Sequence, residues 1–200
     1  MMLRILTIVF NGMPFITWHL PILNRLRVRW HWHVVEGPVR NVHCDSWARP
    51  QPPGTSTDGT TEFLNSICHH PRVSLYRSML WDGRIEMVNT PLDDIKEPCV
   101  LMQVDCDEIW KPEQLEAIVA IFDANPNIGG AEFFCRYFVG QNIIITSRNN
   151  TYGNRCGEWR RAWRYHPGQR FRSHAPPIMN KAIGALASRE ETERMGLVFD

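Results

Sequence analysis

The feature that most constrains this chain is residues 98–110, PCVLMQVDCDEIW, in which an apolar run ends abruptly in three carboxylates. Residues 100–104 are mostly apolar on both faces, which predicts a short strand buried in a parallel sheet covered by helices. Ligands of open α/β sheets bind beyond the carboxyl ends of the strands. Asp105, Asp107 and Glu108 therefore occupy positions where chemistry is usually found.

Asp105 and Asp107 are two residues apart, and in an extended segment their side chains point the same way. Two carboxylates held that close repel each other unless a cation lies between them. Mg²⁺ or Mn²⁺ fits oxygen ligands of this kind and keeps positions open for phosphate oxygens. The alternative is that these acids cap a helix beginning near Pro112. Their position after a buried strand favours the metal.

Strands are predicted over residues 3–10, 30–36, 73–76, 100–104, 129–139 and 143–146, and helices over 60–67 and 112–125, with another beginning near residue 13. This alternation predicts a nucleotide-binding α/β sheet. The first strand is followed by neither a G-x-G-x-x-G turn nor a Walker-type phosphate loop. The pattern of residues 149–174, rich in Arg, Trp, Tyr and Gly, does not settle their structure.

The length of 200 residues and the 44% hydrophobic content fit one domain with a sizeable core. The formal net charge of +1 gives no general affinity for polyanions. Between residues 136 and 172, however, eight arginines accompany one acid, which predicts an anionic ligand or partner there. A non-catalytic nucleic-acid binder using this segment is one alternative. The acidic strand ends and the small total charge disfavour it.

The six cysteines have no C-x-x-C spacing, which predicts free thiols in a reducing cytoplasm and no zinc site. No segment approaches the length of a transmembrane helix, and the apolar start is too short for a secretory signal. Residues 197–200 are a strand-like run without a polar tail. This ending predicts either that the chain is cut short or that its last strand lies at an edge of the sheet.

On residues 101–110, LMQVDCDEIW, the chain resembles the GT-A glycosyltransferases, particularly the family 2-like group, in which an apolar strand ends in a D-x-D motif. The resemblance implies a single GT-A domain over residues 1–200: a Rossmann-like sheet that binds a nucleoside-diphosphate sugar and is flanked by helices. Residues 1–110 would bind the donor, and residues 111–200 would form the acceptor side. The implied reaction moves the sugar to a carbohydrate or other hydroxyl acceptor, with inversion, using Mn²⁺ or Mg²⁺.

The resemblance also implies a set of donor-binding residues: Asn11, Glu36, Asp58, Arg84 and Asp105. They match, in order, the family's first strand and turn, the acid ending its second strand, a later S-D-G loop, the basic residue before the fourth strand, and the D-x-D motif. Two of them have structural alternatives. Glu36 is otherwise an exposed acid at a strand end, and Asp58 is otherwise the cap of the helix that follows it.

In this resemblance Asp105 contacts the ribose or the metal, and Asp107 ligates a metal that stabilises the departing diphosphate. Inversion also needs a base for the acceptor hydroxyl. Glu158 is the candidate, as the one acid of the basic segment, beside tryptophans that can stack on sugar rings; its alternative is an ion pair with a neighbouring arginine. The segment departs from the family's Q-x-x-R-W pattern. His174 is a candidate metal or phosphate ligand, with a structural role as the alternative.

Paired carboxylates with a divalent metal also serve nucleotidyl- and phosphoryl-transfer enzymes. This second enzyme class lacks support from a lysine-containing or glycine-rich phosphate loop in the chain. The sequence therefore ranks a metal-dependent glycosyltransferase first.

Overall fold

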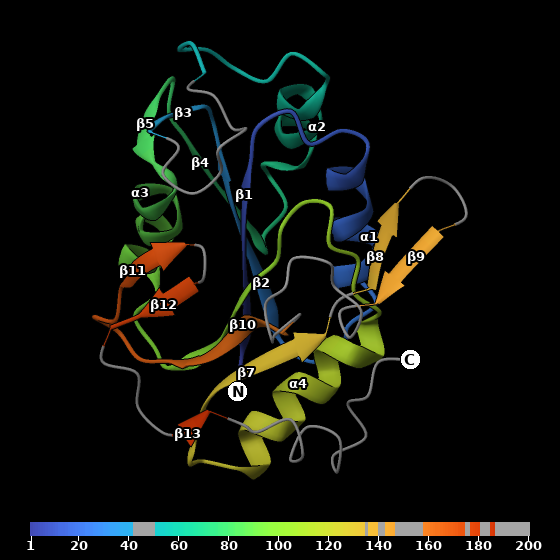
Figure 1. Cartoon of the computed structure of the whole chain (residues 1–200), viewed down its shortest axis with the longest axis vertical. Coiled ribbons are helices and arrows are strands. Elements are labelled where there is room, and N and C mark those ends of the chain that lie inside the picture. Colours follow the sequence, from blue (N-terminus) through green and yellow to red (C-terminus); the bar gives the residue numbers. More distant parts are fainter. Residues whose placement is uncertain are drawn as a thin grey trace.

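The structure, a computed structural model, describes residues 1–41, 51–134, 136–139, 143–146, 158–174, 177–180 and 185–186. Its centre is a seven-stranded sheet in the order β13-β7-β10-β6-β1-β2-β4 (Figure 1). These strands are β1 (Leu3–Val9), β2 (Trp30–Glu36), β4 (Val73–Arg77), β6 (Cys99–Gln103), β7 (Ile128–Phe134), β10 (Glu158–Tyr165) and β13 (Ala185–Leu186). Strands β4, β2, β1 and β6 are parallel, whereas β10 runs antiparallel to both β6 and β7. The predicted α/β sheet is confirmed, and it is mixed rather than all parallel.

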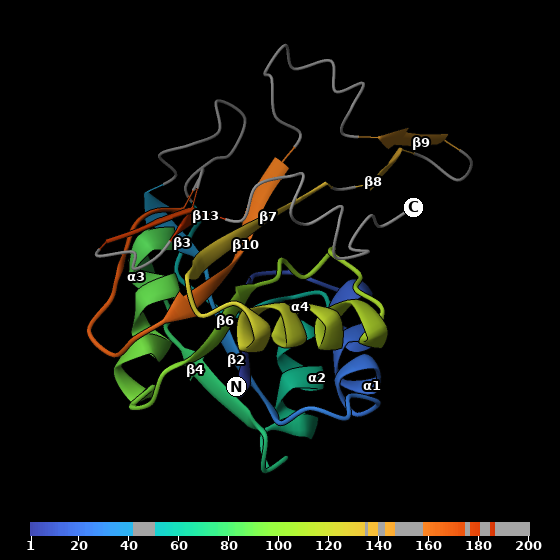
Figure 2. The ribbon, with the colours of Figure 1, turned by 90° about the horizontal axis from the view of Figure 1, so that it is seen from below.

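Helices cover both faces of this sheet (Figures 1 and 2). On one face lie α1 (His19–Leu23), α2 (Thr60–Ile67) and α4 (Pro112–Ala124), and on the other lies α3 (Arg84–Asn89). Two 3-10 helices, η1 (Phe15–Trp18) and η2 (Thr90–Asp94), precede α1 and follow α3. Three two-stranded sheets are formed by β3 (Val39–Asn41) with β5 (Trp81–Gly83), β8 (Arg136–Val139) with β9 (Ile143–Thr146), and β11 (Phe171–His174) with β12 (Pro177–Met179).

The core consists of two layers separated by the sheet, because successive side chains of a strand point to opposite faces. In β6, Val100 and Met102 pack in the cluster that contains α1, α2 and α4. Cys99 and Leu101 pack in the opposite cluster, with Met87 of α3. Every residue of β6 is buried, as expected for a central strand covered on both faces.

Most of the predicted elements near the sheet's centre are confirmed with ends that differ by one residue or less. The predicted helix beginning near residue 13 is instead the short η1 followed by the five-residue α1, which contains Pro21. Proline removes one helical hydrogen bond, which is consistent with so short a helix. The predicted strand 129–139 is wrong as a single element, because its two parts, β7 and β8, belong to different sheets.

Residues 158–165, whose structure the sequence left open, form β10 in the middle of the sheet. The strand-like run expected over residues 197–200 lies outside the described residues. In the described part, Cys68, Cys99 and Cys106 are free thiols, as predicted. None of the helices that are described is long and apolar enough to cross a bilayer.

Candidate functional site

The chain changes direction across the sheet between β1 and β6. From β1 it proceeds to β2 and β4 on one side, and it then returns to the other side of β1 as β6. A switch point of this kind creates a crevice beyond the carboxyl ends of the two strands. The loops after β1 and β6 touch there, since a Cβ built on Gly12 would lie 3.3 Å from Sγ of Cys106 and 2.4 Å from Cγ2 of Val9. A larger residue at position 12 would push the two loops apart.

The acids after β6 form a turn over residues 105–108, called the acid turn below. The backbone N–H of Glu108 donates to the carbonyl of Asp105 at 3.0 Å, which closes the turn. Asp105 and Glu108 thereby lie beside each other, and the side chain of Asp107 is exposed. The predicted extended conformation of this segment is wrong, because the chain turns directly after β6.

The cation between the carboxylates of the acid turn is a guanidinium. Arg161 of β10 has a side chain only 3% exposed, and its Nη2 donates to Oδ2 of Asp105 at 2.8 Å and to Oε1 of Glu108. Burial raises the pKa of Glu108 to about 7; the attraction of Arg161 opposes this rise, and the repulsion of Asp105 adds to it. The acid turn is therefore held by an ion pair between β6 and β10.

His19 connects the acid turn to α1. Its Nε2–H donates to the carbonyl of Cys106 at 2.8 Å, and its ring lies against Trp32 with the centroids 5.6 Å apart. Burial lowers the pKa of His19, although its bond to Cys106 and the charge of Asp107 act in the opposite direction. A neutral ring with the proton on Nε2 satisfies this contact.

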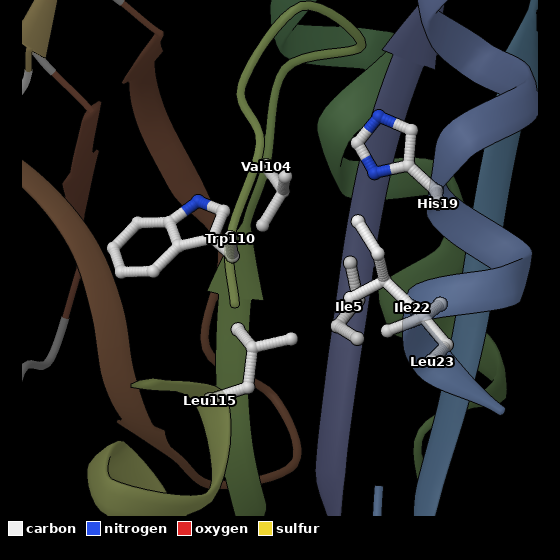
Figure 3. A pocket seen from close by; sticks show the side chains of 7 residues that line it. All are labelled: Ile5, His19, Ile22, Leu23, Val104, Trp110 and Leu115. Atoms are coloured by element: carbon white, nitrogen blue, oxygen red, sulfur yellow. The ribbon is translucent and has the colours of Figure 1, made fainter. Parts of the chain in front are cut away.

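A small pocket lies behind the acid turn, between α1 and the segment that leads into α4 (Figure 3). His19, Ile22 and Leu23 of α1 lie on one side of it, and Trp110 and Leu115 lie on the other. Its volume of about 10 Å³ is near the lower limit for one water molecule. This pocket is too small for a nucleotide and belongs to the packing that supports the turn.

Asn11 and Asp58 join the loop after β1 to the loop before α2. Asn11 adopts a left-handed backbone conformation (φ 54°), and its Oδ1 accepts from the N–H of Thr57 at 2.8 Å. The carboxylate of Asp58 accepts from the N–H groups of Met13 at 2.8 Å and Thr60 at 3.0 Å. Although its slight burial acts in the other direction, these hydrogen bonds lower the pKa of Asp58. The N-cap of α2 is Gly59, so Asp58 lies one residue before the cap position. Its contacts give it a structural role, because they tie the loop after β1 to the first N–H of α2.

Glu36, the predicted acid at the end of β2, is buried rather than exposed, with 2% of its surface accessible. Its Oε2 accepts from Nε of Arg77 at 2.6 Å, and its Oε1 accepts from the hydroxyl of Thr61. The carboxylate thus ties β2 to β4 and α2. The alternative of an exposed acid is therefore wrong, because the two partners replace the water that the carboxylate would otherwise bind. Arg84, half-buried, begins α3 on the opposite face of the sheet.

Glu158 begins β10 and His174 ends β11, and the side chains of both lie outside the described part of the structure. The antiparallel pairing of Ala162 with Met102 places the start of β10 at the carboxyl end of β6. The backbone of Glu158 is therefore at the same edge of the sheet as the acid turn. His174 belongs to the β11–β12 hairpin. Phe171, at the other end of β11, is hydrogen-bonded through its backbone to the side chain of Asn89 in α3.

Sequence reasoning missed Arg161 and His19 as parts of the site, and it assigned the arginine-rich segment to an anionic ligand. Four of its arginines bind within the protein instead: Arg160 with Glu132, Arg161 with the acid turn, Arg164 with the carbonyls of Phe122 and Asn125, and Arg170 with Asp93. The only local signal for a buried strand was the group of apolar residues Ala162, Trp163 and Tyr165, and the arginines among them obscured it. Among the residues that the structure describes, no group of three or more His, Cys, Asp or Glu side chains is placed to hold a metal.

No family model matches the chain, and no curated protein matches it. Solved structures do. S. aureus TarS, residues 1–349, is similar with a TM-score of 0.53 and 16% identity over 72% of this chain. Its complexes with UDP-GlcNAc and with UDP are similar with TM-scores of 0.52. The mannosyltransferase PcManGT from Pyrobaculum calidifontis, solved with GDP-Man and Mn²⁺, has a TM-score of 0.46 and 20% identity over 64% of this chain and 34% of its own.

This chain spans only 38% of the length of the TarS structure that it matches. At this level of identity the likeness concerns the fold. The fold of this chain is that of the GT-A glycosyltransferases.

Proposed function

We propose that this chain is the donor-binding part of a glycosyltransferase that moves a sugar from a nucleoside-diphosphate sugar to an acceptor hydroxyl, with inversion. The observation that carries the proposal is the acid turn, which presents the exposed carboxylate of Asp107 at the switch point of a GT-A sheet. The structures of TarS with UDP-GlcNAc and UDP support a nucleoside-diphosphate donor. A phosphoryl-transfer enzyme has no comparable support.

A divalent ion fits the donor set of the acid turn. Mg²⁺ is bound in proteins by one or two carboxylates together with substrate phosphates and water. Asp107 is exposed, and Asp105 uses Oδ2 for Arg161 while its Oδ1 lies 3.5 Å from Nε2 of Gln103. Asp107 and the Oδ1 of Asp105 would hold the ion. A bound ion there supplies stabilisation for the negative charge of a departing diphosphate.

Glu158 is proposed as the base that deprotonates the acceptor hydroxyl. Its support is the position of its backbone at the carboxyl end of β6, beside the acid turn. Asn11 and Asp58 lie in the two loops that their hydrogen bonds join beyond β1, and they are proposed to contact the nucleotide there. Glu36 enters the proposal as a structural residue, because its carboxylate is already bound by Arg77 and Thr61. Arg84 and His174 remain proposals from the resemblance alone.

The test is isothermal titration of UDP and GDP, with and without Mn²⁺, against the unchanged protein, Asp107→Asn and Asp123→Asn. Asp123 is a matched control because it lies on α4 and pairs with the N-terminus rather than with the acid turn. We expect Mn²⁺-dependent binding of one nucleotide that weakens at least about tenfold in Asp107→Asn, as for the loss of a metal ligand, and stays within about twofold in Asp123→Asn.

Equal affinity in Asp107→Asn and the unchanged protein would remove the acid turn from the donor site. Binding of nucleoside triphosphates in preference to UDP, GDP and their sugar conjugates would favour the phosphoryl-transfer class. Circular dichroism of each variant confirms that the fold is retained. The preferred nucleotide identifies the base of the donor.

A further inference from the structure

Arg161 is a buried cation that bonds to two of the three acids in the acid turn. The side chains of Asp105 and Glu108 are 34% and 20% exposed, whereas that of Arg161 is 3% exposed. A charged side chain that deeply buried is stable only when it is paired and hydrogen-bonded. The pairing with Asp105 and Glu108 supplies that requirement, and it leaves Asp107 as the one acid of the turn not bonded to Arg161.

The direction of Arg161 is set by an irregularity in β10. Along β10, Arg160 is opposite Glu132 and Ala162 is opposite Ala131, so Arg161 is an extra residue relative to β7. An extra residue of this kind bends the strand and re-aims a side chain, and such bulges are frequent beside active sites. The two consecutive arginines consequently go to different partners. Arg160 binds Glu132 of β7, and Arg161 binds the acid turn after β6.

A tethered positive charge in the acid turn affects where a second cation can bind. A divalent ion placed between Asp105 and Glu108 would have to displace the guanidinium, and an ion beside it is repelled by it. The attraction of the turn for a free metal ion is therefore small. The phosphates of a bound nucleotide add the negative charge and the oxygen ligands that an ion at Asp107 lacks.

We propose that Arg161 is a positioning residue: it occupies the space between Asp105 and Glu108 as a built-in cation, fixes the acid turn, and leaves Asp107 to bind a divalent ion only together with the nucleotide. The part played by the nucleotide rests on the proposed function. The occupation of the turn by Arg161 does not, because it follows from the ion pairs of the protein alone.

The test compares Arg161→Met, Arg161→Lys and the matched control Arg160→Met, which also loses an ion pair but at β7. Binding of Mn²⁺ alone is measured by the loss of the free Mn²⁺ signal in electron paramagnetic resonance. We expect Arg161→Met to bind Mn²⁺ at least about fivefold more tightly than the unchanged protein, since two carboxylates lose their cation. Arg161→Lys keeps the positive charge, so its affinity for Mn²⁺ should stay within about twofold of that of the unchanged protein. The affinity of Arg160→Met should also stay within about twofold.

The second measurement is Mn²⁺-dependent titration of the nucleotide that the unchanged protein prefers. We expect nucleotide affinity to fall about tenfold or more in Arg161→Met, because a mispositioned turn no longer presents Asp107. In Arg161→Lys we expect it to fall about threefold, because the lysine ammonium is a point charge without the forked geometry of a guanidinium. Thermal unfolding of each variant shows whether it is folded. If Arg161→Met does not fold, the nucleotide titration of Arg161→Lys decides, and an unchanged affinity overturns the proposal.

The two measurements separate the two proposals. A protein that binds neither UDP nor GDP with Mn²⁺ contradicts the proposed function, and the titration with Mn²⁺ alone still tests Arg161. Affinity for Mn²⁺ that is the same in Arg161→Met and the unchanged protein overturns the role of Arg161 as a cation that occupies the turn. Equal losses of nucleotide affinity in Arg160→Met and Arg161→Met would show a general effect of weakening β10. That result would also overturn the proposed role of Arg161.

Discussion

Glu36 and the acid turn both follow the same rule of placement and differ in what surrounds them. Each lies at the carboxyl end of a parallel strand, and each has a carboxylate bonded to an arginine. Glu36 is enclosed, with Thr61 of α2 and Arg77 of β4 as its partners. The acid turn has one enclosed side, at Arg161 and His19, and one open side, at Asp107.

The comparison shows that an acid at a strand end is not by itself a ligand-binding residue. Glu36 has exchanged water for bonds that join β2 to β4 and to α2, so its effect is expected on stability. Asp107 is outside those bonds, so its effect is expected on binding. The position of a carboxylate along a strand identifies a candidate, and its partners decide between the two roles.

Removal of each carboxylate in turn should have clearly different effects on stability. Glu36→Ala leaves Arg77 without its buried partner. We expect the free energy of unfolding to fall by about 3 kcal/mol, at the low end for a buried ion pair because Arg77 is partly exposed. Asp107→Ala is expected to change it by less than about 0.5 kcal/mol, as for an exposed site. Urea denaturation followed by tryptophan fluorescence measures both. Similar losses in the two variants would contradict the distinction.

The enclosed part of β2 also predicts a dependence on pH. His33 is buried, three residues before Glu36, and contacts Arg4, His31 and Tyr76. Burial, assisted by the positive charges of His31 and Arg4, lowers the pKa of His33 from 6.5 to about 3. As pH falls below about 6.5 the unfolded chain takes up a proton that the folded protein does not, so stability falls, by about 2 kcal/mol at pH 5 for this residue.

Denaturation at pH 7.5 and pH 5 measures this loss. His33→Asn should show a smaller difference between the two pH values than the unchanged protein. His69→Asn is the control, because His69 is exposed, and it should keep the full difference. An undiminished difference in His33→Asn would mean that other groups cause the acid sensitivity.

Asp58 lies between the two extremes, since it is exposed and yet accepts two backbone N–H groups. We expect Asp58→Ala to lower the free energy of unfolding by about 1–2 kcal/mol, because it removes two hydrogen bonds that tie the loop after β1 to the start of α2. Asp58→Asn keeps an acceptor oxygen and should lose less than half of that. A loss in nucleotide affinity without any loss of stability in Asp58→Ala would contradict this structural role.

The smallest expected effect concerns the enclosed side of the acid turn itself. Burial, with the charges of Asp107 and Asp105, raises the pKa of Cys106 to about 12. The folded protein should therefore be alkylated by iodoacetamide at Cys106 at least about tenfold more slowly than at the exposed Cys68. Peptide mass spectrometry of partly alkylated protein compares the two sites. Equal rates would show that the turn opens readily.

The sequence was sufficient for the elements whose signal is local. The apolar runs of β1 and β6, the Trp- and Val-rich segment of β2 and the capped, periodic pattern of α4 each predict their element without reference to the rest of the chain. The burial of Glu36 was not predicted, because the bonds that bury it come from Thr61 and Arg77, which are 25 and 41 residues away. Its partners, rather than its own position, determine its environment.

Strand β10 shows the same limit at a larger scale. Arginines in a buried central strand contradict the pattern expected of one, and they are tolerated because Glu132, the acid turn and the carbonyls at the end of α4 receive them. The bond from Arg161 to Asp105 spans 56 residues, and the bond from His19 to Cys106 spans 87. Nothing in the local sequence specifies either pair, so the geometry of the site required the fold.

The place of β10 between β6 and β7 also has a consequence for synthesis. Strand β6 is complete at residue 103, but the neighbour that pairs with its second edge begins at residue 158. While the ribosome adds the intervening residues, β6 is an edge strand on that side, and its N–H and C=O groups there have no ladder partner until β10 has been made. A nascent chain stopped before residue 158 would present this apolar edge to other chains, which is the condition under which unfinished sheets associate wrongly.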